Sequence, residues 1–545
     1  MPALLPEPPR RQFLRTGLTR ALALAGLANL HVLPAVASPG NATSNDAARV
    51  LRIGLAADVT SMDPHWNNSG PNNAMALHIF ESLVLLDQDA RYIPGLATSW
   101  RPLNPTVWEV RLRAGVRWHD GTPFTSADVK ASLERPARLK GSPGPFTGYT
   151  KTFTAIETPD PLTVRLTTSV ANYANIANDL NSVAIVPQKV AHLGQTAFDS
   201  GEAMIGTGPF HFVRYARGQE ITLRRNPDYW GGAPVWETVT FKILTNNGTR
   251  TAALLSGSVD AIESVPSADV ARLRRHPDFR LEQAISWRVI FWQMDQSRDA
   301  SPYITDLAGA PLGRNPFKDV RVREAVSKAL RRDVLCTRLM EGLAVPASSL
   351  VSAPIFGHPG TPPDAYDPDG ARRLLAAAGY PQGFGLTLHA TNNRYLNDSQ
   401  VAQATAQMLS RIGIRTRVEV MPVASYFSKA RAGTFSFQML GWGSSAGDVA
   451  LRSILGSPND KTGYGTWNWG RYSNPALDRL IARSLSTISS PQDREAVARE
   501  AVRLANADHA VIPSHSQMAT WAMRRGIRYR ARTDEWSLAH QFFPA

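Results

Sequence analysis

A change of hydrophobic pattern along the chain constrains its fold most. Before about residue 245, short runs such as Leu51–Leu55 and Val107–Arg113 alternate between apolar and polar residues, and this period is typical of strands. The stretch Ser301–Phe317 is typical of a loop and is expected to cross between lobes. The pattern predicts a mixed α/β protein of more than one lobe. After about residue 315 apolar residues recur at helical spacing, and we expect helices over 319–335, 369–378, 399–412 and 475–506.

Composition excludes several classes of protein. The single cysteine, Cys336, rules out an intramolecular disulfide and a multi-cysteine zinc or iron–sulfur site. The net charge is +14, but the positive residues are scattered and no basic block is interleaved with aromatics, so no nucleic-acid partner is expected. The chain lacks the HExxH and Walker A motifs, so we expect neither that metalloprotease chemistry nor ATP hydrolysis, and no cofactor.

The first 37 residues have the three parts of an export signal. The pair Arg10-Arg11 is followed by Phe-Leu-Arg, a moderately apolar run covers Ala21–Ala37, and the small residues Ala35-Val36-Ala37 fit a cleavage site. The arginine pair resembles a twin-arginine signal, although an N-terminal helix with a basic start is an alternative. We expect a periplasmic protein cleaved near Ala37. The residue directly after that position is Ser38 and not a cysteine, so no lipid anchor is expected there.

Blocks of sequence distributed over most of the chain follow one known pattern. The longest reads GLATSWRPLNPTVWEVRLRAGVRWHDGTPFTSADVK at 95–130. It resembles the extracytoplasmic solute-binding proteins (family 5) of the dipeptide, oligopeptide and nickel ABC importers, and the resemblance spans about 50–540. Further blocks agree with it in the same order: Gly206–Phe210, Arg225–Trp230, Leu254–Ile262, Asp319–Leu330, Tyr366–Phe384 and Arg471–Pro475.

The resemblance implies a two-lobed periplasmic binding protein of type II (cluster C) with an extra third domain. By analogy, lobe one would comprise 48–75, 200–283 and 510–545. The extra domain would be 76–199 and lobe two 284–509. In this family the lobes close on the ligand about a hinge.

The same resemblance implies a function. The chain would capture a peptide or a similar small polar or anionic solute, and deliver it to an ABC permease that works with separate ATPase subunits. We expect a monomer and no enzymatic activity. A metal-chelate or haem binder, as in the nickel branch, stays open as an alternative, because a chelate can be held without direct protein ligands.

Three segments carry the candidate ligand contacts. In the first, His65, Trp66 and Asn67 follow the first strand, and the resemblance places this loop at the ligand site. Trp66 could stack on a ligand, and His65 and Asn67 could hydrogen-bond it. Local turn formation explains these residues equally well.

The second segment is Asn392–Asn397, which contains Arg394 and Tyr395. It resembles a family loop whose arginine grips the carboxylate of a bound peptide, and a guanidinium offers a planar fork matched to a carboxylate. Arg394 is therefore the strongest single candidate, against the alternative of an ordinary surface arginine.

The third segment, Gly441–Asp448, contains Trp442, Ser445 and Asp448 and resembles the family's "GW-x-x-D" loop. There an aspartate pairs with the α-ammonium group of a peptide. Ser445 stands at that position, so either Asp448 takes the role or the ligand is not an ordinary peptide. The positive net charge favours an acidic ligand.

A remote alternative is a serine hydrolase. Residues 443–447 match G-x-S-x-G with Ser445 as the nucleophile, and Asp508 with His515 or His540 follow in the required order. The motif is short enough to occur by chance, and no lipase-like oxyanion motif precedes it.

Overall fold

The computed structural model describes residues 49–459, 463–487 and 490–545. The expected export signal at 1–37 lies outside this part of the chain. Within the described ranges, no helix is both long and apolar enough to cross a membrane.

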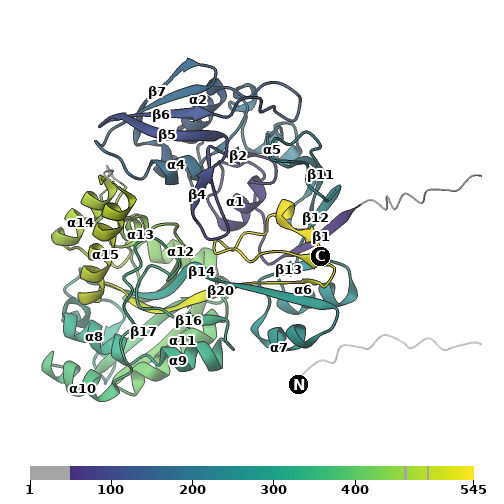
Figure 1. The fold of residues 1–545 in the computed structure, drawn as a ribbon. Coiled ribbons are helices and arrows are strands. Elements are labelled where there is room, and N and C mark those ends of the chain that lie inside the picture. Colours follow the sequence, from purple (N-terminus) through teal and green to yellow (C-terminus); the bar gives the residue numbers. More distant parts are fainter. Residues whose placement is uncertain (1–48, 460–462, 488–489) are drawn as a thin grey trace, which may run out of the picture. The chain divides into compact units, whose positions relative to one another are not determined.

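One large sheet of twelve strands organises the described chain (Figure 1). Its ten-strand path is β10 (Phe210–Ala216), β11 (Glu220–Arg225), β12 (Thr238–Ile243), β1 (Val50–Leu55), β13 (Ala261–Glu263), β20 (Ile512–Arg524), β14 (Phe279–Met294), β19 (Phe437–Trp442), β17 (Phe384–Thr391) and β15 (Ile304–Thr305). Off this path, β16 (Ala344–Pro346) pairs with β20 and β18 (Ile414–Met421) pairs with β17.

The sheet has two parallel regions joined by two long strands. In one region β1 pairs in parallel with β12 and β13, and in the other β17 pairs in parallel with β18 and β19. The long antiparallel strands β14 and β20 run side by side between them (Figure 1). Their register shifts between Ile285 and Val289, opposite Met518 and Ser516, and such a bulge bends a strand locally.

Smaller sheets come from the segment 81–185 and from the C-terminus. The four-stranded antiparallel sheet has the order β5 (Ala97–Asn104), β6 (Val107–Leu112), β8 (Thr163–Thr168), β7 (Phe153–Asp160). Two-stranded pairs are β2 (Glu81–Ser82) with β9 (Ala184–Ile185), β3 (Val84–Leu86) with β4 (Tyr92–Pro94), and β21 (Ile527–Arg528) with β22 (Phe543–Pro544).

Helices cover both the early and the late parts of the chain. The early ones are α1 (Gly70–Ala76), α2 (Ser126–Glu134), α3 (Thr147–Thr150), α4 (Ile176–Ser182), α5 (Gln195–Ser200), α6 (Asn247–Ser256) and α7 (Ser267–Arg275). The later ones are α8 (Val320–Lys328), α9 (Arg332–Val334), α10 (Pro368–Ala377), α11 (Asp398–Ser410), α12 (Val423–Arg431), α13 (Gly447–Ile454), α14 (Pro475–Leu485) and α15 (Pro491–Ala507).

Three expectations about elements were wrong. The helix expected over 475–506 is divided into α14 and α15, because Ser490 accepts a hydrogen bond from the Asp493 amide and Pro491 starts a new helix. The helix expected over 319–335 ends at Lys328, and α9 follows separately. Ser301–Phe317 is not the crossing between the parallel regions, because its residues Ile304–Thr305 pair with β17.

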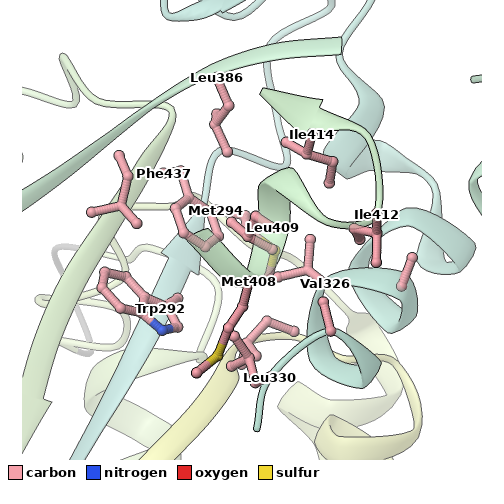
Figure 2. Packing of buried hydrophobic residues seen from close by; sticks show 14 of the residues in the cluster. Trp292, Met294, Val326, Leu330, Leu386, Met408, Leu409, Ile412, Ile414 and Phe437 are labelled. Carbon is pink, nitrogen blue, oxygen red and sulfur yellow. The ribbon is translucent and has the colours of Figure 1, made fainter. Parts of the chain in front are cut away.

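The largest buried cluster packs around β17 and β19 (Figure 2). All eight residues of β17 are buried, as expected for a parallel strand covered on both faces. Trp292 of β14 stacks on Phe437 of β19 with ring centroids 5.4 Å apart. Leu409 of α11 and Val326 of α8 belong to the same cluster. This packing fixes the positions of β17 and β19 relative to each other.

Candidate functional site

The carboxyl ends of β17 and β19 lie next to each other in the sheet. β17 ends at Thr391 and β19 at Trp442, so the loops that follow both strands leave from the same edge. β14 is antiparallel to β19 and places Val289 opposite Trp442. Ligand sites of open α/β sheets lie outside such carboxyl ends. We call the group Arg288, Arg394, Tyr395, Trp442 and Glu535 the edge site.

Tyr395 links the loop after β17 to the end of β19. Its hydroxyl accepts a hydrogen bond from the Gly441 amide at 2.9 Å. A side chain at Gly441 would meet the Tyr395 ring at 2.6 Å, so only glycine fits this approach. The Arg394 guanidinium lies over the same ring, 5.3 Å from its centroid. Trp442 packs on Trp467 with centroids 5.3 Å apart. The structure therefore joins the loop with Arg394 and Tyr395 to Gly441, the neighbour of Trp442 in the chain.

Arg394 is a cation without a carboxylate partner among the described residues. Its backbone amide donates to Asp398 at 3.0 Å, but its guanidinium forms no ion pair and no hydrogen bond there. The side chain is exposed, yet surrounding protein limits its hydration. This desolvation lowers the pKa of Arg394, and the positive charge of Arg288 lowers it further. The site thus offers an open guanidinium fork that an anion would satisfy.

Two residues of the edge site were missed by the motif comparison. Arg288 donates from Nε and Nη2 to the Glu535 carboxylate, at 3.1 and 2.8 Å to the same oxygen. Ser286 donates to the other carboxylate oxygen at 2.7 Å. The sequence signal was that Arg288 directly precedes the apolar run Val289–Trp292.

The Asp448 carboxylate already forms an ion pair within the chain. Its side chain is fully buried, and Arg494 donates to it at 2.8 and 3.1 Å. Ser484 adds a hydrogen bond at 2.8 Å. An ammonium group would have to displace a charge-assisted pair in a buried setting, which is costly. These contacts favour a structural role at the start of α13 over the ligand role considered from the sequence.

Ser445 contacts the early part of the chain instead. Its hydroxyl lies 2.5 Å from the hydroxyl of Tyr92 in β4. Burial raises the pKa of that phenol, which therefore stays protonated at neutral pH. Arg494 also donates to the carbonyl of Ala174 at 3.0 Å. The loop after β19 and helix α15 are thus both linked to the segment 81–185.

The hydrogen bonds described for the first candidate segment do not involve the edge site. His65 is fully buried, and its Nε2 donates to the Ala184 carbonyl at 2.7 Å. The Trp66 carbonyl accepts from Ser142, and Asn67 donates to Thr60 at 3.0 Å. No hydrogen bond within the described ranges joins these three residues to the edge site. Their contacts favour the local structural interpretation.

Burial of His65 predicts an acid-sensitive fold. Desolvation, reinforced by the positive charge of Arg135, lowers its pKa from 6.5 to about 4. The unfolded chain accepts the proton near pH 6.5, so the stabilisation is complete above that pH and is lost as the pH falls toward 4. The loss amounts to about 3 kcal/mol. We expect His65→Gln to flatten the fall in unfolding free energy between pH 6.5 and 4, measured by urea unfolding. His192→Gln, at an exposed position, is the control, and equal slopes for all three proteins would contradict this assignment.

The groups of the hydrolase alternative are not assembled. Ser445 contacts Tyr92, whereas His515 is buried beside Ser514 with its pKa lowered to about 3 by burial. Asp508 accepts from Arg323 at 2.5 Å. For the metal alternative, no group of three or more His, Cys, Asp or Glu side chains in the described ranges is placed to hold an ion.

Comparisons with known proteins agree with the fold. The profile described as "Bacterial extracellular solute-binding proteins, family 5 Middle" matches residues 91–461. The glutathione-binding protein GsiB of Salmonella paratyphi A is 28% identical over 467 residues, covering 84% of this chain and 86% of that protein.

Two solved structures have the same fold. The periplasmic protein DppA from Helicobacter pylori, in complex with the peptide STSA, has a TM-score of 0.76 at 23% identity and covers 91% of this chain and 98% of its own. AgaA from A. tumefacien R10, in complex with agropinic acid, has a TM-score of 0.74 at 26% identity, with coverage of 91% and 99%.

These matches define a two-lobed solute-binding protein of type II, the class that the sequence predicted. The chain belongs to family 5 of the bacterial extracellular solute-binding proteins, and it is the solute-binding component of an ABC importer. Its relatives are binding proteins rather than enzymes.

Proposed function

We propose that this protein binds a small solute that carries a carboxylate, and that Arg394 holds the carboxylate. The open guanidinium of Arg394, at the joint carboxyl edge of β17 and β19, is the observation that carries the proposal. A carboxylate matches its planar fork and supplies the charge that the described residues leave unpaired. Trp442 and Tyr395 line the same edge and add apolar contact.

The relatives support a ligand of this size and charge. The ligands named for similar proteins include glutathione, the peptide STSA and agropinic acid. Because Asp448 is already paired with Arg494, an unpaired acid for an α-ammonium group is lacking at this loop. We therefore favour a modified peptide or another carboxylate over an ordinary peptide with a free amino terminus.

The proposal also covers where the protein acts, how it closes and what it docks on. A twin-arginine signal at 1–37 would direct export to the periplasm, with cleavage near Ala37. The mature monomer would close about β14 and β20, with lobe one at 48–75, 200–283 and 510–545, the extra domain at 76–199, and lobe two at 284–509. The closed form would then dock on a permease served by separate ATPase subunits.

Blocking the carboxylates of a probe tests the proposed function. Glutathione and its diethyl ester have the same backbone, but only the acid can satisfy a guanidinium fork. We expect the acid to bind at least about tenfold more tightly than the ester by isothermal titration calorimetry. Mass spectrometry of solutes released from the purified protein widens the search beyond this probe. Equal affinity for acid and ester, or co-purified solutes without a carboxylate, would contradict the proposal.

The hydrogen bond between Ser445 and Tyr92 provides a second test of binding by closure. It links the loop after β19 to β4, so Ser445→Ala removes a contact that a closed form would keep. A buried hydrogen bond is worth about 1 kcal/mol, so we expect the dissociation rate of bound glutathione to rise about fivefold in stopped-flow measurements. In the control Ser444→Ala, the lost hydroxyl bonds the carbonyl and the amide of the nearby Ala446, and the rate should not change.

A further inference from the structure

Glu535 is held rigidly in an unusual backbone position. Its φ of 69° lies in the left-handed region. This conformation costs a non-glycine residue energy, and it persists only where the surrounding structure enforces it. Arg532 and Asp534, both fully buried, form an ion pair just before it. The Thr533 carbonyl accepts from the Trp287 amide at 3.0 Å, and the Thr533 amide donates to Gln88 at 2.9 Å. These contacts fix the backbone beside Glu535 and thereby the direction of its carboxylate.

The Glu535 carboxylate forms an ion pair with the guanidinium of Arg288. The Arg288 side chain is 14% exposed and that of Glu535 is 28% exposed. Ser286 holds Glu535 and also accepts a hydrogen bond from the Arg288 amide at 2.9 Å. Burial opposes ionisation of Glu535, but the charge of Arg288 and these hydrogen bonds outweigh it and lower its pKa. Glu535 is thus a charged partner within the protein.

The remaining acid near Arg394 does not compete for a ligand. Asp398 accepts from the amides of Arg394 and Tyr395 at 3.0 and 3.2 Å and from the Thr391 hydroxyl at 2.7 Å. These bonds all use one oxygen of the buried Asp398 side chain, and the other oxygen accepts from the Ser399 amide at 2.9 Å. The edge site therefore contains two arginines, of which one is neutralised by Glu535 and one has an open fork.

We propose that Glu535 sets the charge selectivity of the edge site, so that it accepts a single carboxylate and discriminates against dianions. This inference rests on the proposed function, because it assumes that Arg394 receives the anion. The one unpaired guanidinium matches one negative charge. A second charge on the same group would meet Glu535 and would be desolvated without a cation of its own.

The test compares acetate with sulfate, which carry one and two charges. Dissociation constants are measured by isothermal titration calorimetry at constant ionic strength. In Glu535→Gln, both arginines face the anion, and we expect sulfate to bind at least about tenfold more tightly than in the unchanged protein. Acetate should change by less than about threefold. An unchanged ratio of sulfate to acetate affinity, or no sulfate binding by either protein, would overturn the inference.

Two further variants separate charge from structural damage. The double variant Arg288→Gln with Glu535→Gln restores the charge balance, and it should return the ratio of affinities to its original value. Arg288→Gln alone leaves Glu535 beside Arg394, so acetate binding should weaken at least about tenfold. Glu237→Gln, which affects an exposed pair with Arg225, controls for the loss of one negative charge.

Arg394→Ala distinguishes failure of this inference from failure of the proposed function. If Arg394→Ala abolishes acetate binding while Glu535→Gln leaves the ratio unchanged, the charge selectivity is wrong and the proposed function stands. If Arg394→Ala leaves acetate binding intact, the proposed role of Arg394 fails, and with it the assumption on which the selectivity rests.

Discussion

Arg394→Glu is expected to weaken binding of glutathione at least about 100-fold and to leave the melting temperature of the ligand-free protein unchanged within about 1 °C. The side chain is exposed and forms no ion pair with a described residue, so its loss costs the fold little. The new carboxylate would face the anion of the ligand. Losing a charge-assisted bidentate contact and gaining a repulsive one costs about 3 kcal/mol or more, which corresponds to the stated factor.

Isothermal titration calorimetry and thermal unfolding of the same preparations measure both halves of this prediction. Arg373→Glu is the matched control, because Arg373 is an exposed arginine of α10 and the change in net charge is identical. It should leave affinity within about twofold. Unchanged affinity in Arg394→Glu would remove Arg394 from the site. A large fall in melting temperature would instead indicate that its role is structural.

Local patterns predicted several strands in the early part of the chain. The strands expected at Leu51–Leu55 and Val107–Arg113 correspond to β1 and β6 within one residue. The motif comparison also selected Arg394, in the loop after the buried strand β17, and Trp442, the last residue of β19. Such features depend on residues close in sequence, which is why pattern and motif were sufficient for them.

The partners of the site residues could not be predicted in the same way. Arg288 and Glu535 are 247 residues apart in the chain, and Asp448 and Arg494 are 46 apart. No local pattern encodes which distant charge neutralises which. Asp448 was therefore considered as a ligand group from its loop alone, although Arg494 already pairs with its buried carboxylate.

The largest expected effect on stability comes from the loop that contains His65. Arg135 and Asp63 form a bidentate ion pair at 2.6 and 2.7 Å, with side chains 1% and 0% exposed. Arg135 also donates to the carbonyls of Ala191 and Leu193 at 3.1 and 2.9 Å. We expect Arg135→Met to lower the unfolding free energy by about 3–5 kcal/mol, because it leaves a buried carboxylate without its cation. Urea unfolding followed by tryptophan fluorescence measures the change.

Two comparisons identify the orphaned charge as the cause. Arg138→Met removes a cation that is 63% exposed and pairs with Glu134, so it should cost less than about 0.5 kcal/mol. The double variant Arg135→Met with Asp63→Leu removes both buried charges and should recover part of the loss, because replacing a whole buried pair is less costly than breaking it. If the double variant is as unstable as the sum of the two single variants, packing and the backbone hydrogen bonds of Arg135 hold this loop. In that case the ion pair contributes little, and the segment 61–69 depends on shape rather than on charge.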